Sequence, residues 1–259
     1  MQLFADEYDS WYYTKKGKYI SGLEKDVLLK MIAPIEMQDA RYKMQDLQLA
    51  TCNLQLIDIG CGTGYFTQYL SGFCKNIVGV DTSMDMIKYA MKKIEARSQR
   101  SEARIKYIIA DAESLPFKER SFDISVSVTA VNFFKNPAKA VSEAVRISRK
   151  KIFLGVLNRW SMLSFFKKLK SLFKNTSYSD ACFYSQREIT SILSTIEVPL
   201  PVHKLCAGER VRVRGIQKRH TYFLPFPRIR LVLSGLERII PSWLPFGGFM
   251  GIAGEIEKR

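Results

Sequence analysis

Residues 56–67 read LIDIGCGTGYFT, and this stretch decides the fold. An apolar strand runs into a turn with three glycines, and a helical segment follows. Glycine allows backbone conformations that are closed to other residues, and it lets a ligand approach the chain closely. In open α/β sheets, nucleotides bind at such a turn, outside the carboxyl end of a strand. The stretch therefore predicts a strand–turn–helix unit that holds a nucleotide.

The spacing of the glycines indicates which nucleotide. Dinucleotide-binding folds use G-x-G-x-x-G, whereas Gly60, Gly62 and Gly64 are followed directly by Tyr65. A pyrophosphate needs a free helix N-terminus to face, and the acidic Asp58 would lie poorly beside it. A cationic amine would suit that carboxylate better. S-adenosylmethionine carries an amino acid group and no phosphate.

The chain on both sides of this turn, over residues 51–157, alternates between predicted strands and helices. The apolar runs are continuous, as in strands buried on both faces, and lie at Leu54–Ile59, Ile77–Val80, Ile105–Ala110, Phe122–Val128 and Ile152–Leu157. Helical segments separate them at Tyr65–Ser71, Met84–Ala96 and Ala138–Ile147. This alternation predicts an α/β fold with a doubly wound, mostly parallel sheet and helices on both faces.

Asp81 ends the second predicted strand, about 20 residues after the glycine-rich turn. A carboxylate at this place accepts hydrogen bonds from the ribose hydroxyls in dinucleotide folds. The alternative is a helix N-cap, a position that Asp also favours. We predict the ribose role.

These features together resemble motif I and the following motifs of the class I S-adenosylmethionine-dependent methyltransferases. The branch that is most similar contains the ubiquinone/menaquinone and biotin-pathway methyltransferases, and the resemblance extends over roughly residues 1–157. It implies a seven-stranded Rossmann-like sheet with an N-terminal helical arm and a C-terminal insertion that covers the substrate. It implies S-adenosyl-L-methionine as cofactor and S-adenosyl-L-homocysteine as product.

The resemblance also assigns cofactor contacts. Asp111 and the following backbone would bracket the adenine, and we prefer this role to the alternative of an ordinary Asx turn at a strand end. The expected contacts in the core are Asp58, Gly60, Cys61, Gly62, Gly64, Asp81, Thr82, Met84, Asp111, Ala112, Glu113, Val128 and Thr129. The arm would add Tyr8, Tyr12 and Gly17. Phe133 and Phe134 would shape the acceptor pocket or belong to the core.

The remaining chain predicts three further parts around the core of residues 51–157. Residues 1–50 form an N-terminal arm with a helix near Leu23–Ile32. Residues 158–184 contain a basic amphipathic helix, which is a lid, a packing element or a membrane contact. Residues 185–259 complete the sheet and the substrate side.

Local signals within this last part are specific. A helix is expected over Gln186–Leu193, capped by Ser185 with Glu188 three residues on. The alternation of Val211–Arg214 predicts a half-exposed strand, and Phe246–Ile256 a final one.

The composition indicates which partners, cross-links and cellular location to expect. Lys and Arg number 40 against 25 Asp and Glu, so the net charge is +15. This surplus favours anionic partners or simply keeps the protein soluble. The five cysteines include no C-x-x-C pair, so we expect neither a disulfide framework nor a metal site. The polar N-terminus and the lack of an apolar run of ~20 residues predict a cytoplasmic protein without a transmembrane segment.

The predicted reaction is methyl transfer to an unidentified small or lipid-like acceptor by direct in-line displacement. His203 and His220 are the candidate general bases, should the acceptor need to lose a proton. Two alternatives stay open. One is an RNA or protein methyltransferase that uses the basic surface, and the other is a non-enzymatic module that binds S-adenosylmethionine.

Overall fold

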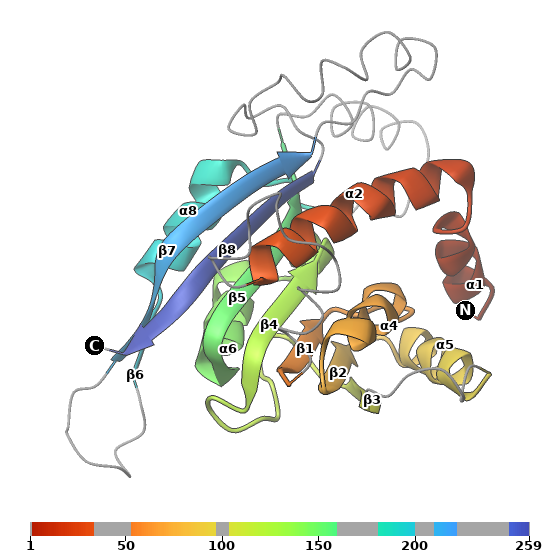
Figure 1. Cartoon of the computed structure of the whole chain (residues 1–259), viewed down its shortest axis with the longest axis horizontal. Coiled ribbons are helices and arrows are strands. Elements are labelled where there is room, and N and C mark those ends of the chain that lie inside the picture. The colour runs from red at the N-terminus through yellow and green to blue at the C-terminus, as the bar shows by residue number, and fades with distance from the viewer. Residues whose placement is uncertain are drawn as a thin grey trace, which may run out of the picture.

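The computed structural model describes residues 2–33, 53–96, 104–159, 181–199, 210–221 and 249–258. Within these ranges one eight-stranded sheet runs in the order β3-β2-β1-β4-β5-β8-β7-β6 (Figure 1). Its strands are β1 (Gln55–Ile59), β2 (Asn76–Asp81), β3 (Arg104–Ile109), β4 (Phe122–Val128), β5 (Ser148–Leu157), β6 (Glu197–Pro199), β7 (Arg210–Thr221) and β8 (Phe249–Lys258). The first five are parallel, and β8, β7 and β6 each pair antiparallel with their neighbours.

The predicted mostly parallel α/β sheet is confirmed. The seven expected strands are β1–β5, β7 and β8, and the three-residue strand β6 adds an eighth at the edge. The predicted strand at Phe122–Val128 coincides with β4 residue for residue. Both strands expected near the C-terminus, within Val211–Arg214 and Phe246–Ile256, are parts of β7 and β8.

Helices cover both faces of the sheet, as predicted. The helices are α1 (Gln2–Trp11), α2 (Lys15–Ile32), α4 (Tyr65–Leu70), α5 (Met84–Glu95), α6 (Pro137–Ile147) and α8 (Gln186–Thr195), with 3-10 turns η2 (Ser71–Phe73) and η3 (Ala130–Phe133). On one face α2 and α4 pack apolar side chains such as Leu28 and Leu70 around Phe153. On the other face α6 and α8 pack side chains such as Val145 and Ile189 around Ile152.

Side-chain caps fix where several helices begin. The Oγ1 atom of Thr14 accepts a hydrogen bond from the Gly17 amide at the start of α2. Asn136 caps α6, and Pro137 occupies its first turn, where a missing N–H costs nothing. Ser185 and Glu188 form the predicted capping box of α8. Each cap is formed by residues close together in the sequence, so caps of this kind can be predicted from the sequence.

Glycines let α2 lie directly on the C-terminal strands. A Cβ atom at Gly251 of β8 would lie 2.5 Å from Cγ1 of Val27 and 2.8 Å from Sδ of Met31. In the same way, a Cβ atom at Gly155 of β5 would lie 2.5 Å from the ring of Phe249. The close approach of helix and sheet therefore depends on the missing side chains.

The buried side chain of Lys151 fastens the end of α2 to β5. Its Nζ atom donates to the carbonyl oxygens of Met31 (3.2 Å) and Ala33 (2.8 Å). Unpaired carbonyls at a helix C-terminus carry partial negative charge, which stabilises a cation there. This contact holds α2 across the sheet (Figure 1).

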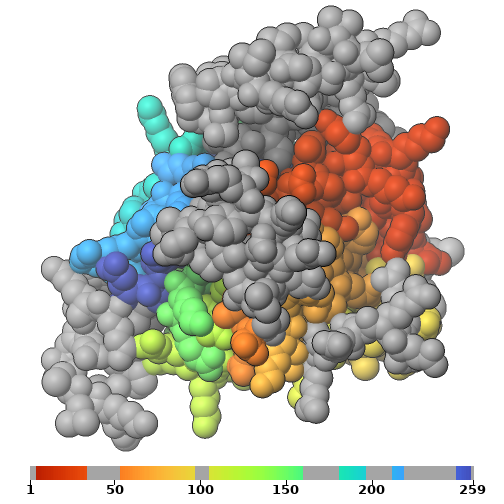
Figure 2. All heavy atoms as spheres, viewed as in Figure 1, coloured from red at the N-terminus to blue at the C-terminus, as the bar shows by residue number. Residues whose placement is uncertain are grey.

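Some predicted features lie outside the described residues: the amphipathic helix, apart from residues 158, 159 and 181–184, and His203. The four-part domain division therefore stays a prediction. None of the helices in the described ranges has the length and apolarity needed to cross a bilayer. In Figure 2 the atoms of α1 and α2 lie directly against those of the β1–α4 segment.

Candidate active site

The glycine-rich turn lies at the carboxyl edge of the parallel strands. The amides of Gly60 and Cys61 both donate to the carbonyl oxygen of Val80, at 2.7 and 2.9 Å, which ties the turn to the end of β2. All three glycines of the turn have positive φ, +75° at Gly60, +53° at Gly62 and +73° at Gly64. Such conformations are unfavourable for residues with a Cβ atom.

The surroundings of the three glycines differ. A Cβ atom at Gly60 would lie 2.2 Å from Cβ of Ala130, and one at Gly64 would lie 2.0 Å from the hydroxyl of Tyr107. At Gly62, the nearest described atom would be Cε1 of Tyr8, at 3.8 Å. Packing therefore excludes side chains at the first and third glycines, whereas the second faces open space that a nucleoside could fill.

Asp81 joins the turn to α5. Its Oδ2 atom accepts a hydrogen bond from the Gly62 amide (2.9 Å), and its Oδ1 atom accepts one from the Ser83 amide (2.8 Å). The N-cap of α5 is Ser83, whose hydroxyl accepts from the Met86 amide. The cap role considered for Asp81 thus belongs to its neighbour. Each carboxylate oxygen has a further lone pair for a ligand hydroxyl.

Asp58 is buried beneath the turn. Its Oδ2 atom accepts a hydrogen bond from Oγ1 of Thr67 at 2.6 Å. Burial raises the pKa of Asp58 to about 7; the Thr67 hydrogen bond opposes this shift, and the charge of Asp81 adds to it. Burial likewise raises the pKa of the neighbouring Cys61 thiol, which keeps it protonated. A cation near Asp58 would favour its ionised form.

Exposed apolar side chains stand beside Asp81. Met84, the first residue of α5, is 53% exposed, and Ile109, the last residue of β3, is 48% exposed. Ile109 lies opposite Asp81 in the β2–β3 register. Exposed large apolar groups at a crevice fit a flat aromatic ligand. Met84 and the exposed Thr82 were predicted contacts, whereas Ile109 was overlooked because it reads as an ordinary strand residue.

The turn after β3 contains Asp111, Ala112 and Glu113. Oδ1 of Asp111 accepts from the Glu113 amide at 2.9 Å, so the Asx turn considered from the sequence is present. Ala112 is buried, and Oε1 of Glu113 accepts from the Asn136 amide at 2.8 Å. These bonds orient the turn and leave the second oxygen of the exposed Asp111 carboxylate facing outward for a donor.

Glu143 and Arg146 of α6 hold the chain that follows this turn. The Arg146 guanidinium donates to the carbonyls of Phe117 (2.8 Å) and Leu115 (3.1 Å), and to both carboxylate oxygens of Glu143 (2.7 Å each). Glu143 in turn accepts from the Leu115 amide at 2.9 Å. Burial would raise the pKa of Glu143, but the hydrogen bonds from Arg146 and Leu115 and the Arg146 charge outweigh it and lower that pKa.

The end of β4 has a strained backbone. Thr129 has φ +60°, and its amide donates to the carbonyl oxygen of Gly155 at 2.7 Å. Positive φ is rare for a β-branched residue and often marks a functional site. The preceding Val128 is buried. Next to it, the buried Asn132 bonds the backbones of Cys182 and Leu157, which ties this edge to the segment after residue 180.

The N-terminal arm closes over the turn through polar contacts. Oδ1 of the buried Asp9 accepts from Oγ1 of Thr63 and from Nζ of Lys93, both at 2.7 Å. Tyr8 lies beside Gly62, and burial raises the pKa of its hydroxyl. Tyr12 stacks on Tyr65, with ring centroids 3.9 Å apart.

Two further predicted residues have a clear place in the fold. Gly17 lies where α2 passes α1, and a Cβ atom there would lie 1.9 Å from the carbonyl oxygen of Trp11. Its position thus serves the packing of the arm. The backbone of His220 is opposite Met250, which is opposite Val156 near the carboxyl end of β5. His220 therefore belongs to the same edge of the sheet as the turn, on a strand well removed from β1. Within the described residues, no three His, Cys, Asp or Glu side chains gather as metal ligands would.

Comparisons with known proteins agree with this geometry. Residues 57–154 match the model of the methyltransferase domain family. An uncharacterized protein of Methanocaldococcus jannaschii is 34% identical over 199 residues, which cover 74% of this chain and 78% of that protein. A malonyl-[acyl-carrier protein] O-methyltransferase of Priestia megaterium is 29% identical over 191 residues, or 68% of this chain and 66% of the enzyme.

Solved structures show the same fold. A crystal structure from Thermotoga maritima, described as a SAM-dependent methyltransferase and possible histamine N-methyltransferase, superposes with a TM-score of 0.63 at 23% identity. The match covers 98% of this chain and 96% of that one. It therefore includes the C-terminal strands as well as the parallel half.

Proposed function

The chain belongs to the class I S-adenosylmethionine-dependent methyltransferases, and from this premise we propose that it methylates a small or lipid-like acceptor by direct in-line displacement. The non-enzymatic alternative is thereby set aside. The main observation for the site is Gly62, where a Cβ atom would contact only the Tyr8 ring, at 3.8 Å, and whose amide donates to Asp81. The cofactor's nucleoside would lie there.

Each part of the carboxyl edge would hold one part of the cofactor. Asp81 would accept hydrogen bonds from the ribose hydroxyls, and Asp111 one from the adenine amino group. Met84, Ile109 and Ala112 would enclose the adenine ring. Asp58, once ionised, would favour the positive charges of the amino acid end. The exposure of Met84 and Ile109 supports this arrangement, because both would lose water-facing apolar surface on binding.

The chemistry asks little covalent work of the protein. S-adenosylmethionine, when bound, supplies a methyl group on a positive sulfur: the acceptor forms a bond to the methyl carbon while the carbon–sulfur bond breaks and sulfur keeps the electron pair. The chain's own contribution is alignment and the exclusion of water, which can supply ~7–11 kcal/mol in favourable cases. The arm, held by Asp9, Thr63 and Lys93, would exclude water. His220 remains the candidate base in the described residues for an acceptor that must lose a proton.

The acceptor would enter past β4 and β5. Phe133, at the end of η3, is 45% exposed beside the buried Asn132, so apolar surface is offered where the strained Thr129 ends β4. The Priestia megaterium relative is named for malonyl-[acyl-carrier protein], a short acyl group carried by a protein, and the short acyl group supports a small acceptor. The RNA or protein alternative would use the basic strand β7, where Arg214 pairs with Glu257 at 3.1 Å and Nε of Arg212 has no hydrogen-bond partner among the described residues.

Calorimetric titration with S-adenosylhomocysteine tests the site. We expect Asp81→Asn to weaken binding by ~10- to 100-fold, the worth of charge-assisted hydrogen bonds. The control is Asp85→Asn, a carboxylate four residues further on, in the first turn of α5, which should stay within about twofold. Equal losses in both variants would reject the ribose role.

A second experiment identifies the acceptor. The protein is incubated with methyl-labelled S-adenosylmethionine and fractionated cell extract, and the fraction that takes the label is determined.

A further inference from the structure

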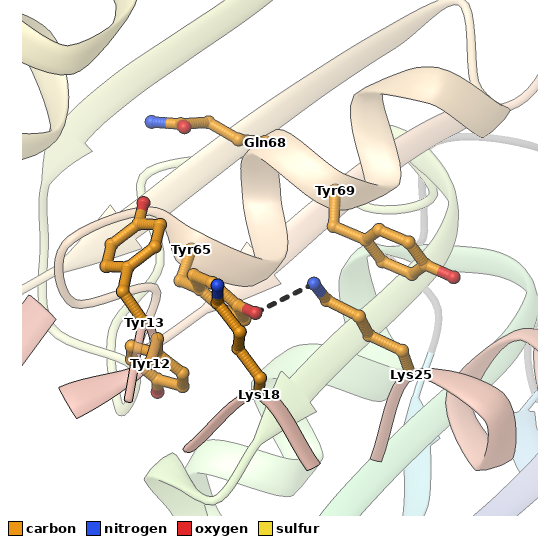
Figure 3. Close-up of a pocket in the computed structure, with 7 residues that line it drawn as sticks. All are labelled: Tyr12, Tyr13, Lys18, Lys25, Tyr65, Gln68 and Tyr69. Carbon is orange, nitrogen blue, oxygen red and sulfur yellow. Dashed lines mark hydrogen bonds between the residues drawn. The ribbon is translucent and has the colours of Figure 1, made fainter. Parts of the chain in front are cut away.

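A second cavity lies on the outer side of the glycine-rich turn, between α2, α4 and the turn that joins α1 to α2. Its volume is about 330 Å³, and it is lined by Tyr12, Tyr13, Lys18, Lys25, Tyr65, Gln68 and Tyr69. Figure 3 shows Lys25 reaching from α2 towards Tyr65 of α4. This volume is within the range of small-molecule sites. None of the roles proposed above uses it.

Two lysine ammonium groups line the cavity. Nζ of Lys25 donates to the Tyr65 hydroxyl at 2.9 Å and lies 4.1 and 4.5 Å from the ring centroids of Tyr65 and Tyr69. Lys18 contributes a second ammonium from one face of α2. In the described part of the chain, neither lysine has a carboxylate within ion-pair distance. A half-buried ammonium without a counter-ion favours a bound anion.

Hydroxyl donors complete the polar lining. Tyr69 is half-buried, and this burial raises the pKa of its hydroxyl to about 12, helped by the charge of Asp26 and by Tyr65. It therefore stays a hydrogen-bond donor at neutral pH. The Tyr65 hydroxyl accepts from Lys25 and shares a hydrogen bond of 2.9 Å with Ser21. Ammonium and phenol groups together suit carboxylate or phosphate oxygens.

One layer of tyrosines separates this cavity from the cofactor crevice. Tyr65 follows Gly64 in sequence and stacks on Tyr12. The Tyr12 hydroxyl lies 3.3 Å from that of Tyr8, which borders Gly62. A molecule in the cavity would therefore contact the far side of the wall that closes the crevice.

We propose that this cavity is an anion-binding site, distinct from the cofactor's own site, which takes the carboxylate or phosphate group of a small molecule. The group belongs to a free anion that acts on the arm, because the tyrosine wall separates the cavity from the cofactor and the acceptor is proposed to enter past β4 and β5. This proposal goes beyond the methyltransferase function, because the site would exist whatever the acceptor is.

The test uses inorganic phosphate and benzoate as probes, with the fluorescence of the protein's tryptophans as readout, since Trp11 packs on Tyr12. We expect saturable binding that Lys25→Met weakens at least tenfold and Lys18→Met at least threefold. Met keeps an apolar chain of similar length on the tyrosine rings. Lys30→Met is the matched control: Lys30 lies on the same helix, is exposed and does not line the cavity. Its affinity should change less than twofold.

Several results would overturn the proposal. Equal losses in Lys18→Met, Lys25→Met and Lys30→Met would mean general attraction of anions by the basic surface. Absence of saturation would mean that no site exists. A large loss of S-adenosylhomocysteine affinity in Lys25→Met would mean that the cavity belongs to the cofactor. Thermal unfolding checks that Lys25→Met folds, and the exposed Lys18 gives a second variant.

A kinetic experiment identifies the source of the anion. Phosphate should change the rate of label transfer to the extract without competing with the acceptor, and this effect should be much smaller in Lys25→Met. Competitive inhibition that Lys25→Met relieves would mean that the acceptor itself occupies the cavity, and would overturn the proposal. Unaltered S-adenosylhomocysteine binding throughout keeps the cofactor assignment separate from this outcome.

Discussion

The two halves of the sheet both depend on glycine, but for different reasons. In the antiparallel half, Gly251 and Gly254 have extended backbones, and a side chain at either would strike Val27 or Val213. In the parallel half, the turn of Gly60–Gly64 has positive φ throughout its glycines. Packing closes two of these positions, and Gly62 stays open. Within this turn, Gly62 is therefore the glycine whose missing side chain leaves room for a ligand.

The largest expected effect comes from filling that open position. We expect Gly62→Arg to weaken binding of S-adenosylhomocysteine by more than ~100-fold, the equivalent of ~2.7 kcal/mol. Positive φ costs a non-glycine residue ~1–2 kcal/mol, so the protein should remain folded. Calorimetry gives the affinity, and thermal unfolding gives the stability.

The control for this change is Gly72→Arg. Gly72 is exposed and lies outside the crevice, and a Cβ atom placed there would meet no described atom within 4 Å. This variant should bind like the wild type. Unchanged affinity in Gly62→Arg would remove the distinction between the two halves.

The reverse experiment fills a glycine of the antiparallel half. Gly251→Val would force Val27, Met31 and Phe153 apart, and overpacking of this kind costs ~1–3 kcal/mol. Denaturant unfolding should show this loss, while the folded protein keeps its affinity for S-adenosylhomocysteine within about twofold. Gly22→Ala, at an open position of α2, should instead stabilise the chain by ~0.5–1 kcal/mol.

A smaller effect should come from the support of the adenine turn. Arg146→Met removes the donors that hold Leu115 and Phe117, and we expect affinity for S-adenosylhomocysteine to fall by roughly 5- to 10-fold, or ~1–1.4 kcal/mol. Glu143→Gln should act in the same direction. Arg149→Met is the control, since Arg149 bonds Ser121 and not this turn. Identical affinities in the Arg146 and Arg149 variants would assign Arg146 to stability alone.

The smallest effect concerns the titration of Asp58, whose pKa is raised to about 7. A cationic ligand binds the ionised form better, so its affinity should rise by about 3- to 5-fold from pH 6 to pH 8 and then level off. Asp58→Asn should bind with a flat pH profile over this range. If the affinity of the wild type were also independent of pH, the charge of Asp58 would have no effect on ligand binding.

The same shift has a consequence for stability. A raised pKa means that the folded state holds the proton more tightly than the unfolded state. This group's contribution is therefore complete below the unfolded value of ~3.9 and is lost as the pH rises through about 7. Asp58→Asn should remove that part of the pH dependence of unfolding.

Local features were accessible from the sequence because neighbours along the chain produce them. The glycine turn, the strand Phe122–Val128 and the Ser185–Glu188 capping box each need only a few consecutive residues. The sequence predicted an N-terminal arm with one helix, but not the first helix, α1, because its aromatic residues follow no clear helical period.

Contacts between distant residues were out of reach. Asp9 forms an ion pair with Lys93, which is 84 residues away in the sequence, and this pair forms only because α1 lies on α5. Tyr107 excludes a side chain at Gly64 only because the β2–β3 register places it under the turn. From the sequence, Asp9 is a carboxylate of the arm, Lys93 a surface lysine and Tyr107 a tyrosine of a strand. The contacts that they make depend on the three-dimensional arrangement.

The hydrogen bonds from Lys151 to the carbonyl oxygens at the C-terminal end of α2 limit the motions by which this enzyme can exchange product for fresh cofactor. One end of α2 is hydrogen-bonded to Lys151 of β5, and residues further along the helix pack on Gly251. The helix therefore cannot move away from the sheet without exposing the buried ammonium of Lys151. Entry and exit of the cofactor would then depend on movement of α1 about residues 12–17, which would break the Asp9 contacts and expose the buried Ala5 and the Tyr8 ring beside Gly62.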